Sequence, residues 1–119
     1  MRIAVPEFQG RISPILEQSN NFVVFTVEGG KITGKERVSN PDTSLPGLLE
    51  FLTGKRVDLL LCGSLLPQTF HLLSLHNIGV IWGAVGGIDE AISSFLAGVF
   101  PYPPPARKRW RWGKRKKWR

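Results

Sequence analysis

The hydrophobic and polar positions of this chain change their spacing along its length. Three early runs predict strands: the short apolar run at 2–6, the run at 22–28, which is rich in β-branched and aromatic residues, and the more polar run at 31–38, which suits an exposed edge strand. Gly29 and Gly30 join the last two runs, and a two-glycine connection predicts a hairpin because both positions tolerate positive φ angles. Pro6 is expected to end the first strand, and residues 7–21 are expected to form a long loop.

Beyond the hairpin, helical and strand-like spacings alternate. The pattern predicts helices at residues 48–54, 67–76 and 88–97, and strands at residues 57–62 and 78–82. The near-continuous apolar run at 57–62 is expected of a strand that is covered on both faces. Asn77 stands where a left-handed residue ends a helix, and a glycine-rich turn at 83–87 precedes the last helix.

This order of elements predicts an α/β fold with a mixed five-stranded sheet. Strands that alternate with helices through short links pair in parallel by right-handed crossovers. The early hairpin then adds an antiparallel flank, and helices cover both faces. The proline-rich residues 101–106 indicate a stiff spacer. The sequence therefore predicts a domain at 1–100, a spacer at 101–106 and a tail at 107–119.

The basic residues are concentrated in that tail. The chain has 119 residues, with 16 Lys and Arg against nine Asp and Glu and a net charge of +7. Nine of the 16 lie in residues 107–119 together with three tryptophans and no acid, which leaves seven basic and nine acidic residues before them. The candidate anion-binding residues are Arg107, Lys108, Arg109, Trp110, Arg111, Trp112, Lys114, Arg115, Lys116, Lys117, Trp118 and Arg119.

Several partners are compatible with this tail. Dense positive charge attracts phosphate, and tryptophans stack on unpaired bases or lie at lipid headgroups, so nucleic acid and other anionic surfaces are both candidates. Two further interpretations remain open. The tail is a solvated extension whose attraction for anions is incidental, or its tryptophans pack on the domain or on a neighbouring subunit.

Other classes of protein are not expected. The longest apolar runs fall far short of the roughly 18 residues that span a bilayer, so no transmembrane segment is predicted. The apolar run at 3–5 is too short for the core of a signal peptide. Cys62 is the only cysteine and cannot form an internal disulfide, which favours a cytoplasmic protein. No convergent set of carboxylates and no nucleophile with a paired base is evident, so the chain is interpreted as non-catalytic.

A series of short motifs along the chain resembles one known family. The motifs are Met1-Arg2-Ile3-Ala4-Val5-Pro6, Ile12-Ser13-Pro14, Asn40-Pro41, Val57-Asp58, Cys62-Gly63, Pro67, Ile78-Gly79-Val80, Gly83-Ala84 and Asp89-Glu90-Ala91-Ile92. Their order and spacing over residues 1–100 resemble the dinitrogenase iron–molybdenum cofactor biosynthesis family, as a small stand-alone member similar to NifX. The resemblance implies a ribonuclease H-like fold, a non-catalytic role in binding or carrying metalloclusters, and proteins that donate and accept the cluster.

The candidate site lies where the strands end. Ligands of α/β sheets usually bind beyond the carboxyl ends of the parallel strands. Cys62 is the only soft ligand expected there, and its thiolate is predicted to hold iron or an iron-containing cluster. Ser13, Gly63 and Ser64 are predicted to complete this cofactor-binding site. The alternative interpretation is that Cys62 is a small buried apolar side chain, as free cysteines commonly are.

Overall fold

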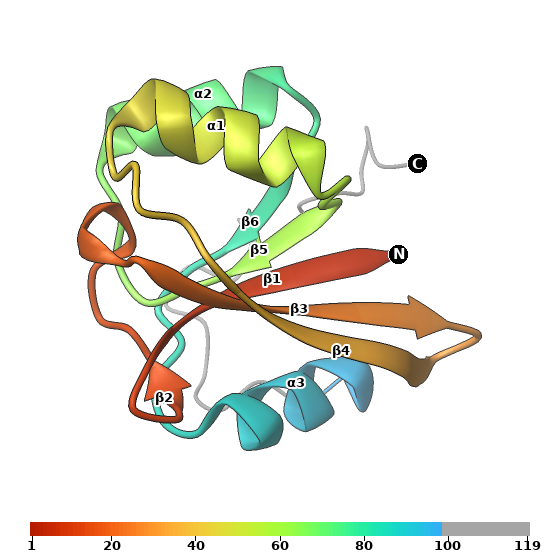
Figure 1. Ribbon diagram of the computed structural model, residues 1–119. Helices are drawn as coiled ribbons and strands as arrows, with labels where there is room; N and C mark the ends of the chain where they lie inside the picture. The colour runs from red at the N-terminus through yellow and green to blue at the C-terminus, as the bar shows by residue number, and fades with distance from the viewer. Residues whose placement is uncertain (99–119) are drawn as a thin grey trace.

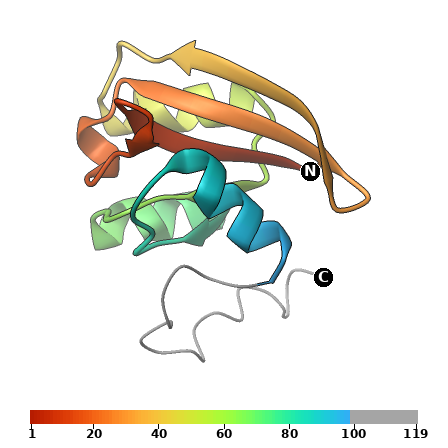
Figure 2. The ribbon, with the colours of Figure 1, turned by 90° about the horizontal axis from the view of Figure 1, so that it is seen from below.

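The computed structural model describes residues 1–98, so the predicted spacer at 101–106 and the predicted tail at 107–119 lie outside the described residues. One sheet lies between two layers of helices (Figure 1). Helices α1 (Leu45–Gly54) and α2 (Pro67–Leu75) cover one face of the sheet, and α3 (Ile88–Leu96) covers the other (Figures 1 and 2). Within residues 1–98, no helix has the length and apolar character needed to cross a membrane.

The sheet is mixed, as predicted. Its strands are β1 (Arg2–Phe8), β2 (Arg11–Ile12), β3 (Asn21–Glu28), β4 (Lys31–Ser39), β5 (Leu59–Leu61) and β6 (Gly79–Ile81). The order is β4-β3-β1-β5-β6, with β2 paired to β1 beside this path. Strands β1, β5 and β6 are parallel, and the β3–β4 hairpin is antiparallel. The sheet has six strands where five were predicted, because the two-residue strand β2 was not anticipated.

The first strand is longer than predicted. Pro6 lies inside β1, opposite Phe22 of β3, and does not end the strand. Parallel pairing with β5 stops at Ala4, so a residue that has no N–H to donate lies beyond that ladder. The chain then reverses, and β2 pairs back onto the end of β1. The expectation that residues 7–21 form only a loop was therefore wrong for its first part, since backbone groups of β2 pair with β1.

Two of the turns predicted from the sequence form at the predicted residues. Gly29 and Gly30 have φ angles of 61° and 79°, as a tight hairpin requires, and Asn77 ends the second helix with a φ of 62°. Helix α1 begins earlier than predicted because Ser44 caps it. The Ser44 hydroxyl accepts a hydrogen bond from the Gly47 N–H at 3.2 Å, which satisfies one of the free donors of the first turn.

Apolar side chains fill both faces of the sheet. On the α3 face, Ile3, Val5 and Phe25 pack with Leu59 and Ile92. The α1/α2 face has its own apolar cluster: Ala4, Leu16, Phe22, Val24, Leu48, Leu52, Val57, Leu60, Cys62, Leu73, Ile78 and Val80. Because side chains alternate along a strand, neighbouring residues of β5 belong to opposite clusters. This two-sided burial is what the apolar run at 57–62 predicts.

Candidate functional site

The ends of β1, β4, β5 and β6 lie at one edge of the sheet, on the left of Figure 1. The loops that follow these strands are residues 9–20, which include the short strand β2, and residues 40–44, 62–66 and 82–87. We refer to these four loops as the carboxyl edge. Loops in this position form the ligand sites of many α/β sheets, because helices leave the ends of the strands uncovered.

Backbone hydrogen bonds hold the loops of the carboxyl edge together. The Ser64 N–H donates to the Pro14 carbonyl at 2.9 Å, and the Leu16 N–H donates back to the Ser64 carbonyl at 3.0 Å. The Gly83 N–H donates to the Gly63 carbonyl at 2.6 Å. Loops that are far apart in the sequence therefore meet at this edge, as the order of the elements predicts.

Cys62 lies where β5 ends, at the predicted place, and its side chain points into the core. The residue has no exposed surface and packs in the apolar cluster between the sheet and helices α1 and α2. Burial, and then the negative charge of Glu17, raise the pKa of the Cys62 thiol. In this arrangement the thiol is protonated at neutral pH and is not accessible to a metal ion.

The raised pKa predicts how stability depends on pH. The thiol of the unfolded chain ionises near its ordinary pKa of 9.0, whereas the folded chain keeps its proton to higher pH. Ionisation therefore stabilises the unfolded state as pH rises, and Cys62→Ala removes this contribution. We expect the free energy of unfolding of the wild type to fall by about 1 kcal/mol more than that of Cys62→Ala between pH 9 and pH 10. Urea unfolding at both pH values measures the difference, and an equal fall in the two proteins would contradict it.

The other three predicted site residues also lie at the carboxyl edge, where they contact neighbouring loops. The buried Ser13 hydroxyl accepts a hydrogen bond from the Ser19 hydroxyl at 2.8 Å, and the Ser64 hydroxyl donates to the Pro14 carbonyl at 2.7 Å. Gly63 is packed so closely that a Cβ atom there would lie 2.9 Å from the Pro14 carbonyl oxygen. The described contacts of these residues stabilise the edge.

The carboxyl edge has no preformed set of metal ligands among the described residues. Within residues 1–98, no group of three or more His, Cys, Asp or Glu side chains is placed to hold a metal ion. Iron and its clusters prefer thiolate and imidazole ligands, and the thiol available here is buried. The donor set of residues 1–98 therefore does not fit a bound cluster without movement of the loops.

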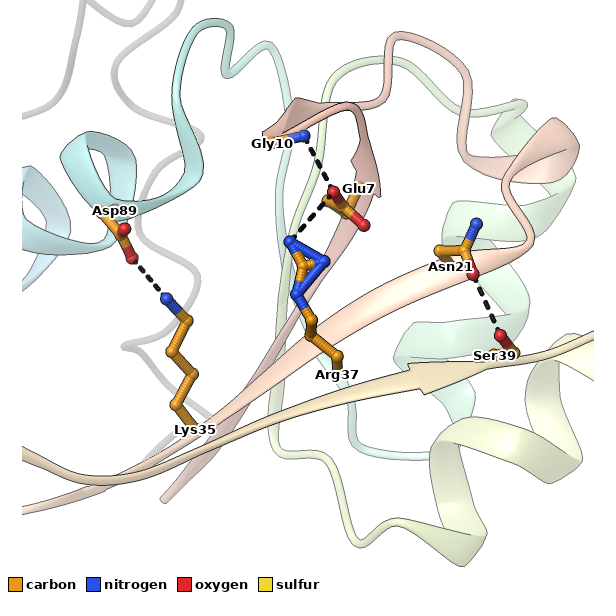
Figure 3. A network of polar contacts seen from close by, with 7 residues as sticks. All are labelled: Glu7, Gly10, Asn21, Lys35, Arg37, Ser39 and Asp89. Carbon is orange, nitrogen blue, oxygen red and sulfur yellow. Dashed lines mark hydrogen bonds and ion pairs between the residues drawn. The ribbon is translucent and has the colours of Figure 1, made fainter.

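Ion pairs fix the exposed strand β4 to the rest of the domain (Figure 3). Glu7, at the end of β1, accepts hydrogen bonds from the Gly10 N–H at 2.8 Å and from Arg37 of β4 at 3.3 Å. Lys35 of β4 reaches Asp89 of α3 at 3.1 Å. These cations of β4 are thus already paired, and they serve the fold.

One feature of the carboxyl edge was not anticipated from the sequence. Six large apolar residues at or beside it are between 40% and 65% exposed: Phe8, Ile15, Leu66, Phe70, Trp82 and Val85. We refer to them as the apolar patch. The other three exposed large apolar residues of the described chain lie elsewhere: Met1, Ile32 and Leu75. The available signal was the occurrence of apolar residues just beyond strand ends, where a loop is usually polar.

The helix layers and the strand order define a small three-layered α/β domain. Its candidate binding site is formed by the loops of the carboxyl edge. The family model for the dinitrogenase iron–molybdenum cofactor family matches residues 1–98. The chain therefore belongs to this family, and the resemblance seen in the sequence is confirmed.

Three similar proteins illustrate how the domain recurs. An uncharacterized protein of Methanocaldococcus jannaschii is 26% identical over 105 residues, which cover 82% of this chain and 87% of that protein. The crystal structure of PH0822 matches with a TM-score of 0.80 at 23% identity, covering 86% of this chain and 96% of the other. The apo form of the orange protein of Desulfovibrio gigas matches with a TM-score of 0.70 at 24% identity, covering 86% and 92%. The two structures show a shared fold.

Proposed function

We propose that this protein is a non-catalytic domain that binds or carries an iron-containing metallocluster. The cargo is the iron–molybdenum cofactor or an iron–sulfur precursor, and the domain receives it from a donor protein and passes it to an acceptor. The observation that carries the proposal is the meeting of sequence-distant loops at the carboxyl edge. Membership of the family over residues 1–98 supports the same role.

The architecture and the cellular location of the domain are also part of the proposal. We propose a ribonuclease H-like architecture, for which a mixed sheet covered on both faces is the supporting feature. We also propose a cytoplasmic protein, because a single free cysteine suits a reducing compartment.

Cys62 is the residue we propose as the sulfur ligand, with Ser13, Gly63 and Ser64 around it. Because its thiol is buried and protonated, coordination requires that residues 62–66 separate from Pro14 and that the thiol lose its proton. Two hydrogen bonds from Ser64 to the Pro14 carbonyl resist this movement. Binding is therefore expected to be slow, and to proceed through a locally opened edge.

Anaerobic reconstitution with iron and sulfide, followed by desalting and metal analysis, tests the proposal. We expect the wild-type chain to retain iron and sulfide, and Cys62→Ala to retain at most about a tenth as much, because the variant has no thiolate left at the carboxyl edge. The matched control is Ser74→Ala on α2, which preserves Cys62 and the carboxyl edge. Thermal melting confirms that each variant is folded.

The possible results separate the parts of the proposal. Equal iron in the wild type and in Cys62→Ala would exclude Cys62 as the ligand, although the carrier role would stand. Iron retained by none of the folded proteins would overturn the carrier role itself. Retention by the wild type and by Ser74→Ala alone would support both.

A second candidate function is an interaction module that has lost its cargo and binds nucleic acid or another anionic surface through residues 107–119. The observation in its favour is the sequence of the tail, with nine basic residues and three tryptophans among 13 positions. Retention on heparin that weakens steeply with salt, and that is lost when the chain ends at residue 106, supports this function. Equal retention of a chain with a scrambled tail would show that the attraction is incidental.

A further inference from the structure

We propose that the apolar patch at the carboxyl edge is a docking surface for the basic, tryptophan-rich tail of the same chain, residues 107–119. The inference concerns only the protein's own segments, and it stands whether or not a metallocluster is the cargo.

Four members of the apolar patch lie in segments that are bonded to one another: Ile15, Leu66, Phe70 and Trp82. Ser64 forms a β-bridge with Ile15, and Leu66 lies two residues further along the same loop. Phe70 lies one helical turn beyond Leu66, to whose carbonyl its N–H is bonded at 3.0 Å. The β6–α3 loop, which contains Trp82, is bonded to Gly63. Exposed apolar side chains from three segments therefore lie beside the same stretch of backbone, residues 63–66.

Two carboxylates beside the patch form no ion pair with described residues. Glu17 lies between the loops with its carboxylate 2.9 Å from the Leu66 N–H, and it forms no ion pair within residues 1–98. Glu90 is exposed at the start of α3, its carboxylate lying against Gly87 of the β6–α3 loop, and it also forms no ion pair with any described residue. Arg11 of β2 bridges to Gly87, is exposed and forms no ion pair within residues 1–98, so Glu17 and Glu90 together outnumber it. A partner that brings both aromatic rings and cations would match this surface.

The tail has the composition that this surface requires. The tail alternates arginine and tryptophan at residues 109–112 and carries nine basic residues without an acid. It therefore offers rings for the apolar patch and guanidinium groups for the unpaired carboxylates and for the face of Trp82. A second copy that presented the same edge would instead place Glu17 and Glu90 near their own counterparts. Charge complementarity thus favours the tail over a symmetric dimer.

The chain between α3 and the tail is long enough for the tail to reach the patch. Eleven residues, 99–109, lie between Gly98 and Trp110, and the twelve Cα-to-Cα steps of an extended chain span up to about 40 Å. The longest dimension of the domain is 32 Å. Attachment at the end of α3 also keeps the tail near the domain at an effective concentration of about a millimolar, so that modest contacts suffice for docking.

Trypsin digestion of the full-length chain tests the proposal, because the tail contains many cleavage sites and docking restricts access to them. The edge variant Leu66→Ser/Trp82→Ser removes two members of the patch. Its matched control, Ile32→Ser/Leu75→Ser, removes two exposed apolar residues that lie away from the edge. We expect the tail of the edge variant to be cleaved about fivefold faster than that of the wild type, and the control to behave as the wild type, since cleavage follows the undocked population. Mass spectrometry measures the rates, and circular dichroism confirms that each chain is folded.

A second variant tests the same contact by changing the tail. Trp110→Ser/Trp112→Ser/Trp118→Ser retains every basic residue, and we expect the same acceleration, with no further effect when it is combined with the edge variant. Equal rates in the wild type and the edge variant would overturn the proposal. Protection that increases with protein concentration, accompanied by a dimer in light scattering, would overturn it too, because the occupant would then be a second copy.

Discussion

Replacing Phe22 with alanine is expected to lower the free energy of unfolding by about 3–5 kcal/mol, the usual cost of removing a fully buried phenylalanine. Phe22 is completely buried on the α1/α2 face of β3, and its ring lies 5.1 Å from that of Phe51 on α1. The cavity left by the ring would adjoin the apolar cluster that holds Cys62, so the same change would loosen the base of the carboxyl edge. Urea unfolding measures the loss.

Two further variants separate this effect from a general intolerance of substitution. Phe22→Leu keeps most of the volume and is expected to cost less than about 1.5 kcal/mol. Leu75→Ala removes a large apolar side chain from an exposed position away from the apolar patch, where we expect a change within about 0.5 kcal/mol. A loss in Leu75→Ala comparable with that in Phe22→Ala would contradict the assignment of the effect to burial.

Local chemistry accounts for most of the fold that the sequence predicted. Two adjacent glycines can adopt the positive φ angles of a hairpin, and Asn77 can end a helix in the same region of φ. The handedness of crossovers then leaves few ways to order the strands. Each of these signals acts within a few residues or through a general rule of topology, so it is visible without coordinates.

The parts of the fold that could not be predicted depend on contacts between distant segments. Strand β2 exists because its backbone groups find partners on β1 and on the loop before α3, where the Ile12 N–H donates to the Gly86 carbonyl at 2.9 Å. The run from Arg11 to Ile12 has no strand signal of its own. Pro6 is tolerated because pairing with β5 has already stopped, which depends on the length of another strand.

The candidate site was only partly predictable for a related reason. The position of Cys62 beyond a central strand follows from topology, and the structure places it there. The direction of its side chain follows from alternation: Leu60 and Cys62 belong to the same apolar cluster, and a sheet covered on both faces buries either direction. The burial of the thiol therefore follows from the apolar run at 57–62. The sequence offered no comparable signal for the contacts of Ser13 and Ser64, since both bond to other loops.

Gly63→Ala is expected to lower the free energy of unfolding by about 1–3 kcal/mol, the range for forcing an atom into a packed site. A Cβ atom would lie 2.9 Å from the Pro14 carbonyl oxygen and 3.1 Å from that of Ser13. Both are backbone atoms, so neither can move aside by a change of rotamer. The loops would have to separate, at the expense of the two hydrogen bonds from Ser64 to Pro14. Gly54→Ala is the matched control, because a Cβ there meets nothing within 4 Å and alanine favours the helix by about 0.5–1 kcal/mol.

The same variant connects stability with access to the proposed ligand. If separation of residues 62–66 from Pro14 exposes Cys62, a thiol reagent should modify Gly63→Ala at least about tenfold faster than the wild type under native conditions, because reaction follows the population of the opened edge. Gly54→Ala should react no faster than the wild type. The dependence of the rate on urea separates the two routes: modification through a locally opened edge changes little at low urea, whereas modification through global unfolding rises with the full slope of the unfolding transition. Modification of Gly63→Ala at the rate of the wild type would mean that Cys62 is reached by another route, and the opening required for coordination would then lie elsewhere in the domain.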